Sequence, residues 1–250
     1  MNIQQFLKAY YEFLIEHTNP QRAKKEKAYL YSDFKHYGIA FGLRSQFIKK
    51  YKKELAQLEK TDALNLIDTL WHKDSFEEKM LALDVLGLHA KKIDHTDMPF
   101  IEHLLRTSKG WALLDSFIIQ IMPGLLEREP QTYDILKKWI TDSDFWVRRS
   151  ALLSQLLFFR KNNGGNKKLF FDFAVSQFDE GWIDSLYKNT LDKKRAKFFI
   201  RKAIGWALRE MSVKDPQPVF KFLKRYKNEM SGLSFREGSR KLPEELKKLL

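Results

Sequence analysis

One acidic side chain, Asp115, stands in a run of large apolar residues, 111–119, in a chain whose formal net charge is +13. Residues four apart lie on one face of a helix, so Asp115 and Trp111 would be presented together. A carboxylate on an apolar face needs a partner that compensates its lost hydration. That partner is either a group of the protein, as in a structural ion pair, or a cation that develops in a reaction. The second case fits an oxocarbenium-like state at a glycosidic bond, which a carboxylate stabilises while it orients water.

Two later segments add arginine and indole side chains in similar settings. Arg148 and Arg149 follow Trp146 and point in different directions, so one could pair with an acid while the other contacts a phosphate. Trp206 follows Gly205 in a segment rich in lysine and arginine, where an exposed indole could stack on a sugar, a base or a cation. The core is the usual place of tryptophan at helical spacing, and of the three indoles Trp206 has the least core-like surroundings.

Positive charge is concentrated toward the two ends of the sequence. Residues 1–60 hold 12 basic and 6 acidic side chains, residues 61–130 hold 7 and 12, and residues 131–250 hold 26 and 14, which gives net charges of +6, −5 and +12. A polyanion would be held by the N-terminal region and the C-terminal half, with Asp115 between them. A solvated surface gives the same charge pattern. The most basic segment contains Lys193, Lys194, Arg195, Lys197, Arg201, Lys202 and Arg209.

Nearly every segment predicts helix, because apolar residues recur at intervals of three and four and no run alternates with a period of two. Residues 161–166, rich in asparagine and glycine, predict a loop. Linkers are short, so we expect a single domain over residues 1–250. The predicted helices are 2–17, 21–34, 41–57, 62–72, 76–92, 97–107, 111–128, 131–141, 145–161, 167–178, 181–190, 193–212, 216–228 and 242–249.

Large aromatic residues open successive predicted helices. Phe76, Trp111 and Trp146 follow at intervals of 35 residues, and a similar opening at Phe198 comes after a longer interval. Paired-helix repeats have periods of roughly 34 to 47 residues and stack into curved arrays around a continuous core. The predicted fold class is therefore all-α, with HEAT-like helical repeats stacked into a curved α-solenoid that has a concave basic cleft.

The composition excludes several classes of protein. The chain has no cysteine, which excludes disulfides, thiolate nucleophiles and cysteine-ligated zinc. Its six histidines are scattered without the spacing of a metal motif, so we expect no metal and no cofactor. Nucleotide-binding, hydrolase and kinase motifs are absent. No stretch is long and apolar enough to cross a membrane, and the N-terminus lacks a signal-peptide layout, which predicts a cytoplasmic protein.

Taken together, the three chemical segments resemble the DNA alkylation repair family of HEAT-like-repeat glycosylases, the AlkD-like proteins. The resemblance spans nearly the whole chain. It rests on WALLDS at 111–116, FWVRRSALL at 145–153 and FIRKAIGWALRE at 199–210, with support from KAYL at 27–30 and YGI at 37–39. The two C-terminal motifs are the most specific.

The resemblance implies an enzyme that removes positively charged N3- and N7-alkylated purines from double-stranded DNA. Carried over by matched motif, Asp115 is similar to the catalytic carboxylate, and Arg149 to the arginine beside it. Trp111 and Trp206 are similar to the aromatic walls that contact the deoxyribose at the lesion. The expected DNA contacts are Tyr29, Arg148, Arg201, Lys202 and Arg209.

The chemistry of such a lesion agrees with a single acid. Alkylation at N3 or N7 places positive charge on the purine, so the leaving group needs no general acid. The family further implies recognition without a pocket for a flipped base. No lysine is marked out as a Schiff-base nucleophile, so we expect a monofunctional enzyme. We also expect a monomer that is associated with the nucleoid.

Two other functions fit the sequence. A noncatalytic helical-repeat module could bind branched or damaged DNA through the same basic cleft. A protein-binding scaffold is the third interpretation, and salt dependence separates it from the first two, because only phosphate contacts predict a steep loss of binding with salt.

Overall fold

The computed structural model describes residues 2–250, and over these residues the chain forms no strand, only one isolated backbone bridge between Lys35 and Ser75. The predicted all-α class is confirmed. The earlier helices are α1 (Ile3–Glu16), α2 (Pro20–Leu30), α3 (Phe41–Ala56), α4 (Lys60–Trp71), α5 (Phe76–Leu88), the short 3-10 helix η1 (His95–Asp97), α6 (Met98–Thr107) and α7 (Trp111–Arg128). The later ones are α8 (Thr132–Trp139), α9 (Phe145–Leu153), α10 (Leu156–Lys161), α11 (Lys167–Ser176), α12 (Gly181–Leu186), α13 (Thr190–Ser212), α14 (Pro216–Tyr226), α15 (Gly232–Ser239) and α16 (Glu244–Lys247).

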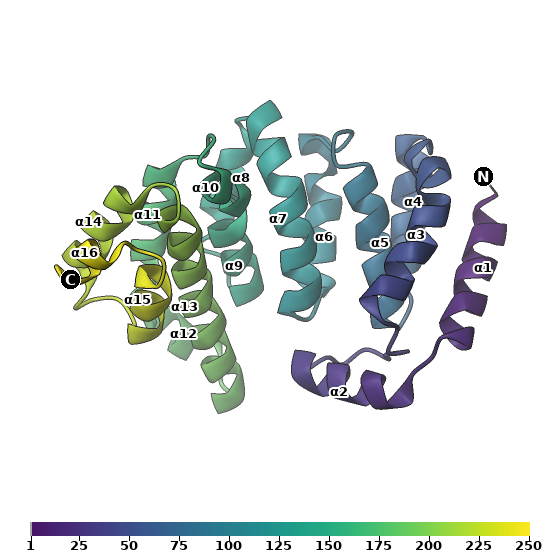
Figure 1. Cartoon of the computed structure of the whole chain (residues 1–250), viewed down its shortest axis with the longest axis horizontal. Coiled ribbons are helices and arrows are strands. Elements are labelled where there is room, and N and C mark those ends of the chain that lie inside the picture. The colour runs from purple at the N-terminus through teal and green to yellow at the C-terminus, as the bar shows by residue number, and fades with distance from the viewer. Residues whose placement is uncertain (1) are drawn as a thin grey trace. The chain divides into compact units, whose positions relative to one another are not determined.

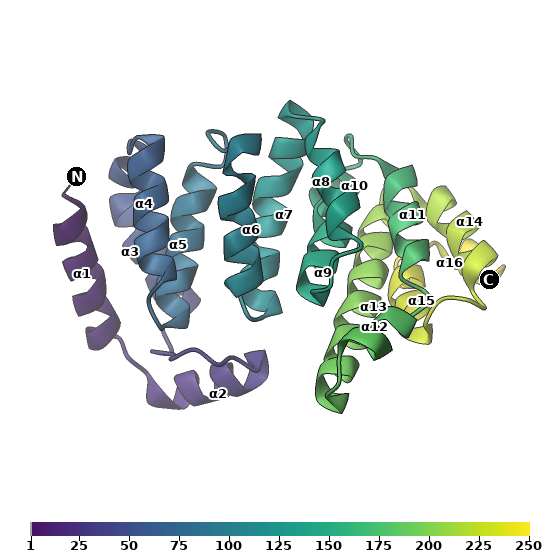
Figure 2. The same ribbon diagram turned by 180° about the vertical axis from the view of Figure 1, so that it is seen from behind.

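The chain packs as two compact units, a first unit that ends at Phe117 and a second that begins at Ile118. The boundary lies inside the continuous helix α7, and the single domain over residues 1–250 stays a prediction. In the first unit, α3 to α6 stand side by side, and α2 runs crosswise at one end of them (Figures 1 and 2). Among the described residues, no helix has the length and apolar character needed to span a bilayer.

Helices α4 and α5 supply the centre of the first unit. They bury Leu66, Ile67 and Leu70 from one helix and Leu81 and Leu86 from the other, each at 1% exposure or less. These residues recur at the helical spacing that the sequence shows. Burial of each such side chain contributes roughly 1.5–3 kcal/mol, which makes this pair the support for the elements around it.

Aromatic residues begin three helices at the predicted interval. Phe76 is the first residue of α5, Trp111 is the first of α7, and Trp146 is the second of α9. The prediction that Phe198 opens a helix is wrong, because α13 begins at Thr190 and Phe198 lies in its third turn. The repeat pattern is therefore regular only over the first three positions.

The predicted helix 145–161 is two helices, α9 and α10, separated at Ser154 and Gln155. Gln155 leaves the helical conformation, with φ −103° and ψ 7°. Its buried side chain accepts the backbone N–H of Asn166 at 2.5 Å, at the end of the predicted loop. The interruption of the helix thus places a side chain that holds the loop.

Helix α15 is missing from the sequence-based prediction, because glycine and serine fill half of its eight residues and lower its helix propensity. Two glycines instead serve its packing on α13. A Cβ on Gly205 would lie 2.5 Å from the Cβ of Glu237, and a Cβ on Gly238 would lie 3.0 Å from the Cβ of Leu208. The two helices therefore approach more closely than any larger residue would permit.

Helix α2 has no buried residue, so its position must be fixed from outside. The anchor is Glu77 in the first turn of α5, a residue that is 3% exposed. Its carboxylate accepts the backbone N–H groups of Tyr37, Gly38 and Ile39 at 3.1, 2.7 and 3.2 Å. Because a hydrogen bond to a charged group contributes about 1.5–3 kcal/mol, the turn 37–39 is held firmly on α5.

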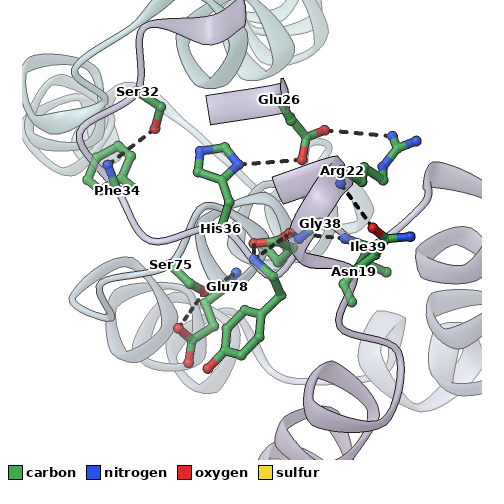
Figure 3. Close-up of polar contacts among 12 residues, drawn as sticks. Asn19, Arg22, Glu26, Ser32, Phe34, His36, Gly38, Ile39, Ser75 and Glu78 are labelled. Atoms are coloured by element: carbon green, nitrogen blue, oxygen red, sulfur yellow. Dashed lines mark hydrogen bonds and ion pairs between the residues drawn. The ribbon is translucent and has the colours of Figure 1, made fainter. Parts of the chain in front are cut away.

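The turn 37–39, fixed in this way, positions the start of α2. Gly38 has a left-handed backbone with φ +75°, and a Cβ there would lie 2.4 Å from the carbonyl oxygen of Asn19. The N–H of Asn19 donates to the carbonyl of Tyr37 at 2.8 Å. A second contact joins Glu26 of α2 to His36, whose Nδ1 lies 3.4 Å from the carboxylate (Figure 3). Helix α2 is thus attached through this turn to α5.

We expect Glu77→Gln to lower the free energy of unfolding by about 1–3 kcal/mol and to loosen α2, because the amide removes the charge and points a donor at backbone N–H groups. Urea unfolding measures the first effect, and hydrogen exchange of residues 19–31 measures the second. The control is Glu78→Gln, since the Glu78 carboxylate accepts the Ser75 hydroxyl, contacts none of the N–H groups of the turn 37–39, and belongs to the same helical turn as Glu77. Equal exchange of α2 in both variants would contradict the anchor.

Gly205→Ala should lower the free energy of unfolding by about 1–3 kcal/mol, because the added methyl group forces α13 away from α15. The control is Gly42→Ala on α3, where a Cβ meets nothing within 4 Å and alanine improves helix propensity. Chemical denaturation of both variants decides the matter. A Gly205→Ala protein as stable as the wild type would show that the crossing has spare room.

Candidate functional site

Three of the predicted site residues lie together in the first unit. Trp111 begins α7, Asp115 follows one turn later, and Tyr29 lies in the last turn of α2. Trp111 is half-buried, whereas Tyr29 is 71% exposed. The Tyr29 ring meets the indole edge-on, with centroids 6.0 Å apart and planes at 85°. This unit therefore presents a phenol, an indole and a carboxylate from two helices.

Asp115 is a nearly buried acid, at 8% exposure. Its helical neighbours Leu113, Leu114 and Phe117 are each 2% exposed or less. The hydroxyl of Ser116 donates to the carbonyl of Ala112 at 2.6 Å, so it is bound within the helix. A carboxylate that has little contact with water interacts strongly with any cation that forms beside it.

The start of α7 is shaped by the residues just before it. Lys109 has a left-handed backbone, with φ 49°, and the carbonyl of Gly110 accepts the N–H of Leu114 at 3.3 Å. A small pocket of about 10 Å³ joins this turn to the end of α2. Its lining includes Leu30, Ser32, Phe34, Phe76, Ser108, Lys109, Gly110, Ala112 and Leu113.

Lys79 is a buried lysine near this turn. Burial lowers its pKa, and the positive charge of Lys109 lowers it further, although Asp74 acts in the opposite direction. Its ammonium group donates to the carbonyl of Trp71 and lies 4.7 Å from the centre of the Phe34 ring. These contacts give Lys79 a packing role.

In the second unit, Arg149 of α9 contacts Phe199 of α13, which belongs to an aromatic cluster. It is 4% exposed, and its Nη1 donates to the carbonyl of Phe199 at 2.7 Å. The guanidinium also lies 5.5 Å from the centre of the Phe199 ring. Trp146 packs on the same ring at 4.7 Å, so the indole belongs to this packed cluster.

Arg148 is turned into the protein. It is 8% exposed, and its guanidinium donates to the carbonyls of Asp142 and Thr141 and to the side chain of Gln177, at 2.5, 3.2 and 3.2 Å. One face of the group lies 3.6 Å from the centre of the Trp182 ring. Burial lowers its pKa. Three of its five N–H donors are thus used inside the second unit, and the DNA contact of Arg148 stays a prediction.

Trp206 is half-buried on α13 and is oriented by an acid one turn later. Its Nε1–H donates to Glu210 at 3.0 Å, and the other carboxylate oxygen of Glu210 accepts from Arg160 at 2.8 Å. Burial alone would raise the pKa of Glu210, but the hydrogen bonds from Arg160 and Trp206 hold it below its ordinary value. Sequence reasoning misses Glu210 because its partner Arg160 lies 50 residues away.

The basic side chains of α13 that are predicted to contact phosphates form ion pairs with acidic residues outside this helix. Arg201 makes two hydrogen bonds of 2.6 Å to Glu180, which raise the pKa of the guanidinium. Lys202 and Arg209 both pair with Glu237 of α15. The hydrogen bond from Lys202 contributes most to the lowered pKa of Glu237.

Two other cations of α13 are not paired in this way. Within residues 2–250, Lys194 and Arg195 make no ion pair, and Lys194 is exposed. They lie in the first two turns of the helix, before the paired residues. The sequence contains both in its basic segment, but only the packing of Glu180 and Glu237 separates them from Arg201, Lys202 and Arg209.

Groups of side chains that could hold a metal ion lie elsewhere in the described residues. One consists of Asp68, His72 and His103, and another of Glu26, His36 and Glu77. Neither contains Trp111, Asp115, Arg149 or Trp206.

Comparison with known proteins agrees with this placement of helices. A solved structure described as a predicted DNA alkylation repair enzyme from Enterococcus faecalis superposes with a TM-score of 0.76 at 24% sequence identity, over 91% of this chain and 98% of that one. A search among curated proteins finds no match. The family model of DNA alkylation repair enzymes matches residues 11–242. The chain therefore belongs to the DNA alkylation repair enzyme family.

Proposed function

We propose that this protein is a DNA glycosylase that hydrolyses the N-glycosidic bond of positively charged N3- and N7-alkylated purines, such as 3-methyladenine and 7-methylguanine. The observation that carries the proposal is the nearly buried carboxylate of Asp115, one helical turn from Trp111 and its exposed neighbour Tyr29. Membership of a DNA repair family makes DNA the expected substrate.

The proposed reaction needs one acid. The bond between C1′ and the purine nitrogen breaks, and its electron pair neutralises the positive charge of the departing base. Asp115 stabilises the oxocarbenium-like sugar and orients a water molecule, which adds to C1′ and gives its proton to the carboxylate or to solvent. The products are a neutral alkylpurine and an abasic site.

In this proposal the aromatic residues line the sugar. Trp111 and Trp206 would contact the deoxyribose, Tyr29 would contact the DNA near the lesion, and Arg149 would assist the catalytic carboxylate. The proposal includes recognition of the lesion without a pocket for a flipped base. The phosphates would contact Lys194 and Arg195 directly. They would contact Arg201, Lys202 and Arg209 after replacing the carboxylate partners of these side chains.

We further propose that the protein is a monomer and acts on chromosomal DNA in the cytoplasm.

We expect Asp115→Asn to lower release of 3-methyladenine and 7-methylguanine from alkylated duplex DNA by about 100-fold or more, because a neutral amide does not stabilise the sugar cation. Binding to the same DNA should persist and fall steeply with salt. The control is Asp97→Asn, since Asp97 is 9% exposed and pairs with Lys60 at 2.7 Å away from the site.

The outcomes separate the candidate functions. Excision by the wild type and by Asp97→Asn, lost in Asp115→Asn, supports the glycosylase. DNA binding without excision in any of the three proteins would instead favour a noncatalytic DNA-binding protein of the same family.

A second prediction concerns the orientation of Trp206. Glu210→Ala should lower excision by about tenfold, because an indole that loses its acceptor no longer holds one position and small displacements reduce rates strongly. Glu210→Gln keeps an acceptor for the indole N–H and should recover most of the activity. Single-turnover rates measured with saturating protein separate this effect from weaker binding. Equal rates in the alanine variant and the wild type would remove Glu210 from the mechanism.

A further inference from the structure

Three side chains with metal-binding atoms converge on the surface of the first unit. Asp68 lies on α4, His72 caps the C-terminal end of the same helix, and His103 lies on α6. One such atom from each lies within 4.8 Å of those of the other two. The imidazole rings of the two histidines stack, with centroids 6.0 Å apart and planes at 22°. Thirty-one positions separate the histidines, so the spacing motifs used for the sequence do not reveal the pair.

The Nδ1 of His72 faces Asp68, whose carboxylate oxygen Oδ1 lies 3.4 Å away. The same Nδ1 lies 2.9 Å from the backbone carbonyl oxygen of Asp68, an atom that only accepts, so Nδ1 carries the proton. The lone pair of Nε2 is then available to a metal. A histidine that ligates a metal usually donates its other N–H to a carbonyl or carboxylate, which fixes the tautomer and the ring position.

The two helices that carry the histidines are joined next to them. The buried residue Trp71 donates its Nε1–H to the hydroxyl of Thr107 at 2.7 Å. That hydroxyl donates in turn to the carbonyl of His103 at 2.6 Å. Because these bonds hold the backbone of α6 against the end of α4, a cation here would not have to order the helices first.

We propose that Asp68, His72 and His103 bind one divalent transition-metal ion, with zinc as the best fit. Two imidazoles and a carboxylate are the ligand types of zinc, which takes water as a fourth ligand where the protein supplies three. The side chains of Asp68 and His72 are 48% and 64% exposed, which leaves access for the ion and its water. Magnesium prefers oxygen ligands and is a poor fit.

The other group of possible ligands is less suitable. The Glu77 carboxylate already accepts three backbone N–H groups, and the Nδ1 of His36 faces Glu26. The Asp68, His72 and His103 site is separate from Asp115 and Trp111, so the inference does not depend on the proposed glycosylase activity. A bound ion would link the end of α4 to α6 and stabilise the first unit.

Calorimetric titration of zinc into the chelator-treated full-length protein tests the proposal. We expect saturable binding of one ion, weakened about tenfold or more by His72→Gln or His103→Gln, since loss of even an outer partner of a ligand costs that much. Zinc should raise the melting temperature of the wild type but not that of the double variant. Because the side chains are exposed, the metal-free variants should have the same melting temperature as the metal-free wild type.

The matched control is His17→Gln. The Nδ1 of His17 contacts the carbonyl of Phe13 at 3.1 Å, the same local arrangement as in His72, but His17 belongs to neither group of possible ligands. This variant should bind zinc as the wild type does, and excess magnesium should not compete. The proposal is overturned if the wild type shows no saturable zinc binding, or if the double variant binds zinc with unchanged affinity.

Discussion

The placement of the first unit's candidate site depends on one buried carboxylate, that of Glu77. Helix α2 is rich in lysine and has no buried residue, so hydrophobic packing does not hold it. The Glu77 carboxylate accepts three backbone N–H groups of the turn 37–39 and so fixes this turn. Gly38 of the turn lies directly against Asn19 at the start of α2. The edge contact between Tyr29 and Trp111 depends on this chain of contacts, because it sets the position of α2 relative to α5. Loss of the carboxylate would leave three buried donors without a partner, which costs more than the bonds contribute.

Carboxylates also position functional residues in the second unit, where they pair with basic side chains. Glu180 and Glu237 lie beside the basic helix α13 and pair with its arginine and lysine side chains, and Glu210 of α13 itself pairs with Arg160 of α10. Partly exposed ion pairs of this kind contribute about 0–1 kcal/mol each, so a phosphate can replace the carboxylate at little cost. The acids therefore hold the basic side chains in defined positions without preventing a phosphate contact. In the proposed function, Lys194 and Arg195 would meet the DNA backbone first, because neither has an ion pair with another residue of 2–250 to exchange.

Each half-buried indole of the proposed site has a neighbouring side chain that helps to orient it. Trp111 meets the ring of Tyr29, and Trp206 donates to Glu210. A reaction that relies on stabilising a short-lived sugar cation needs such fixed positions, since electrostatic stabilisation is effective only where groups need not reorganise. The mechanism proposed for Asp115 therefore depends on residues, Glu77 and Glu210, that the sequence does not mark as functional.

The sequence by itself determined what depends on neighbours along the chain. Helical periodicity established the all-α class, the positions of Phe76 and Trp111 at helix starts, and the shared face of Trp111 and Asp115, because these follow from residues three or four apart. It missed α15, whose glycines lower helix propensity yet permit its approach to α13.

Only the tertiary structure decided the partners of each side chain. Arg148 and Arg149 are adjacent and chemically identical. The first donates hydrogen bonds to Asp142, Thr141 and Gln177, whereas the second donates one to the carbonyl of Phe199. In the same way, the stacking of His72 on His103 depends on the packing of α4 and α6. The physical reason is that hydrogen bonds and ring contacts are short-range, so they are set by which distant segments the packed core brings together.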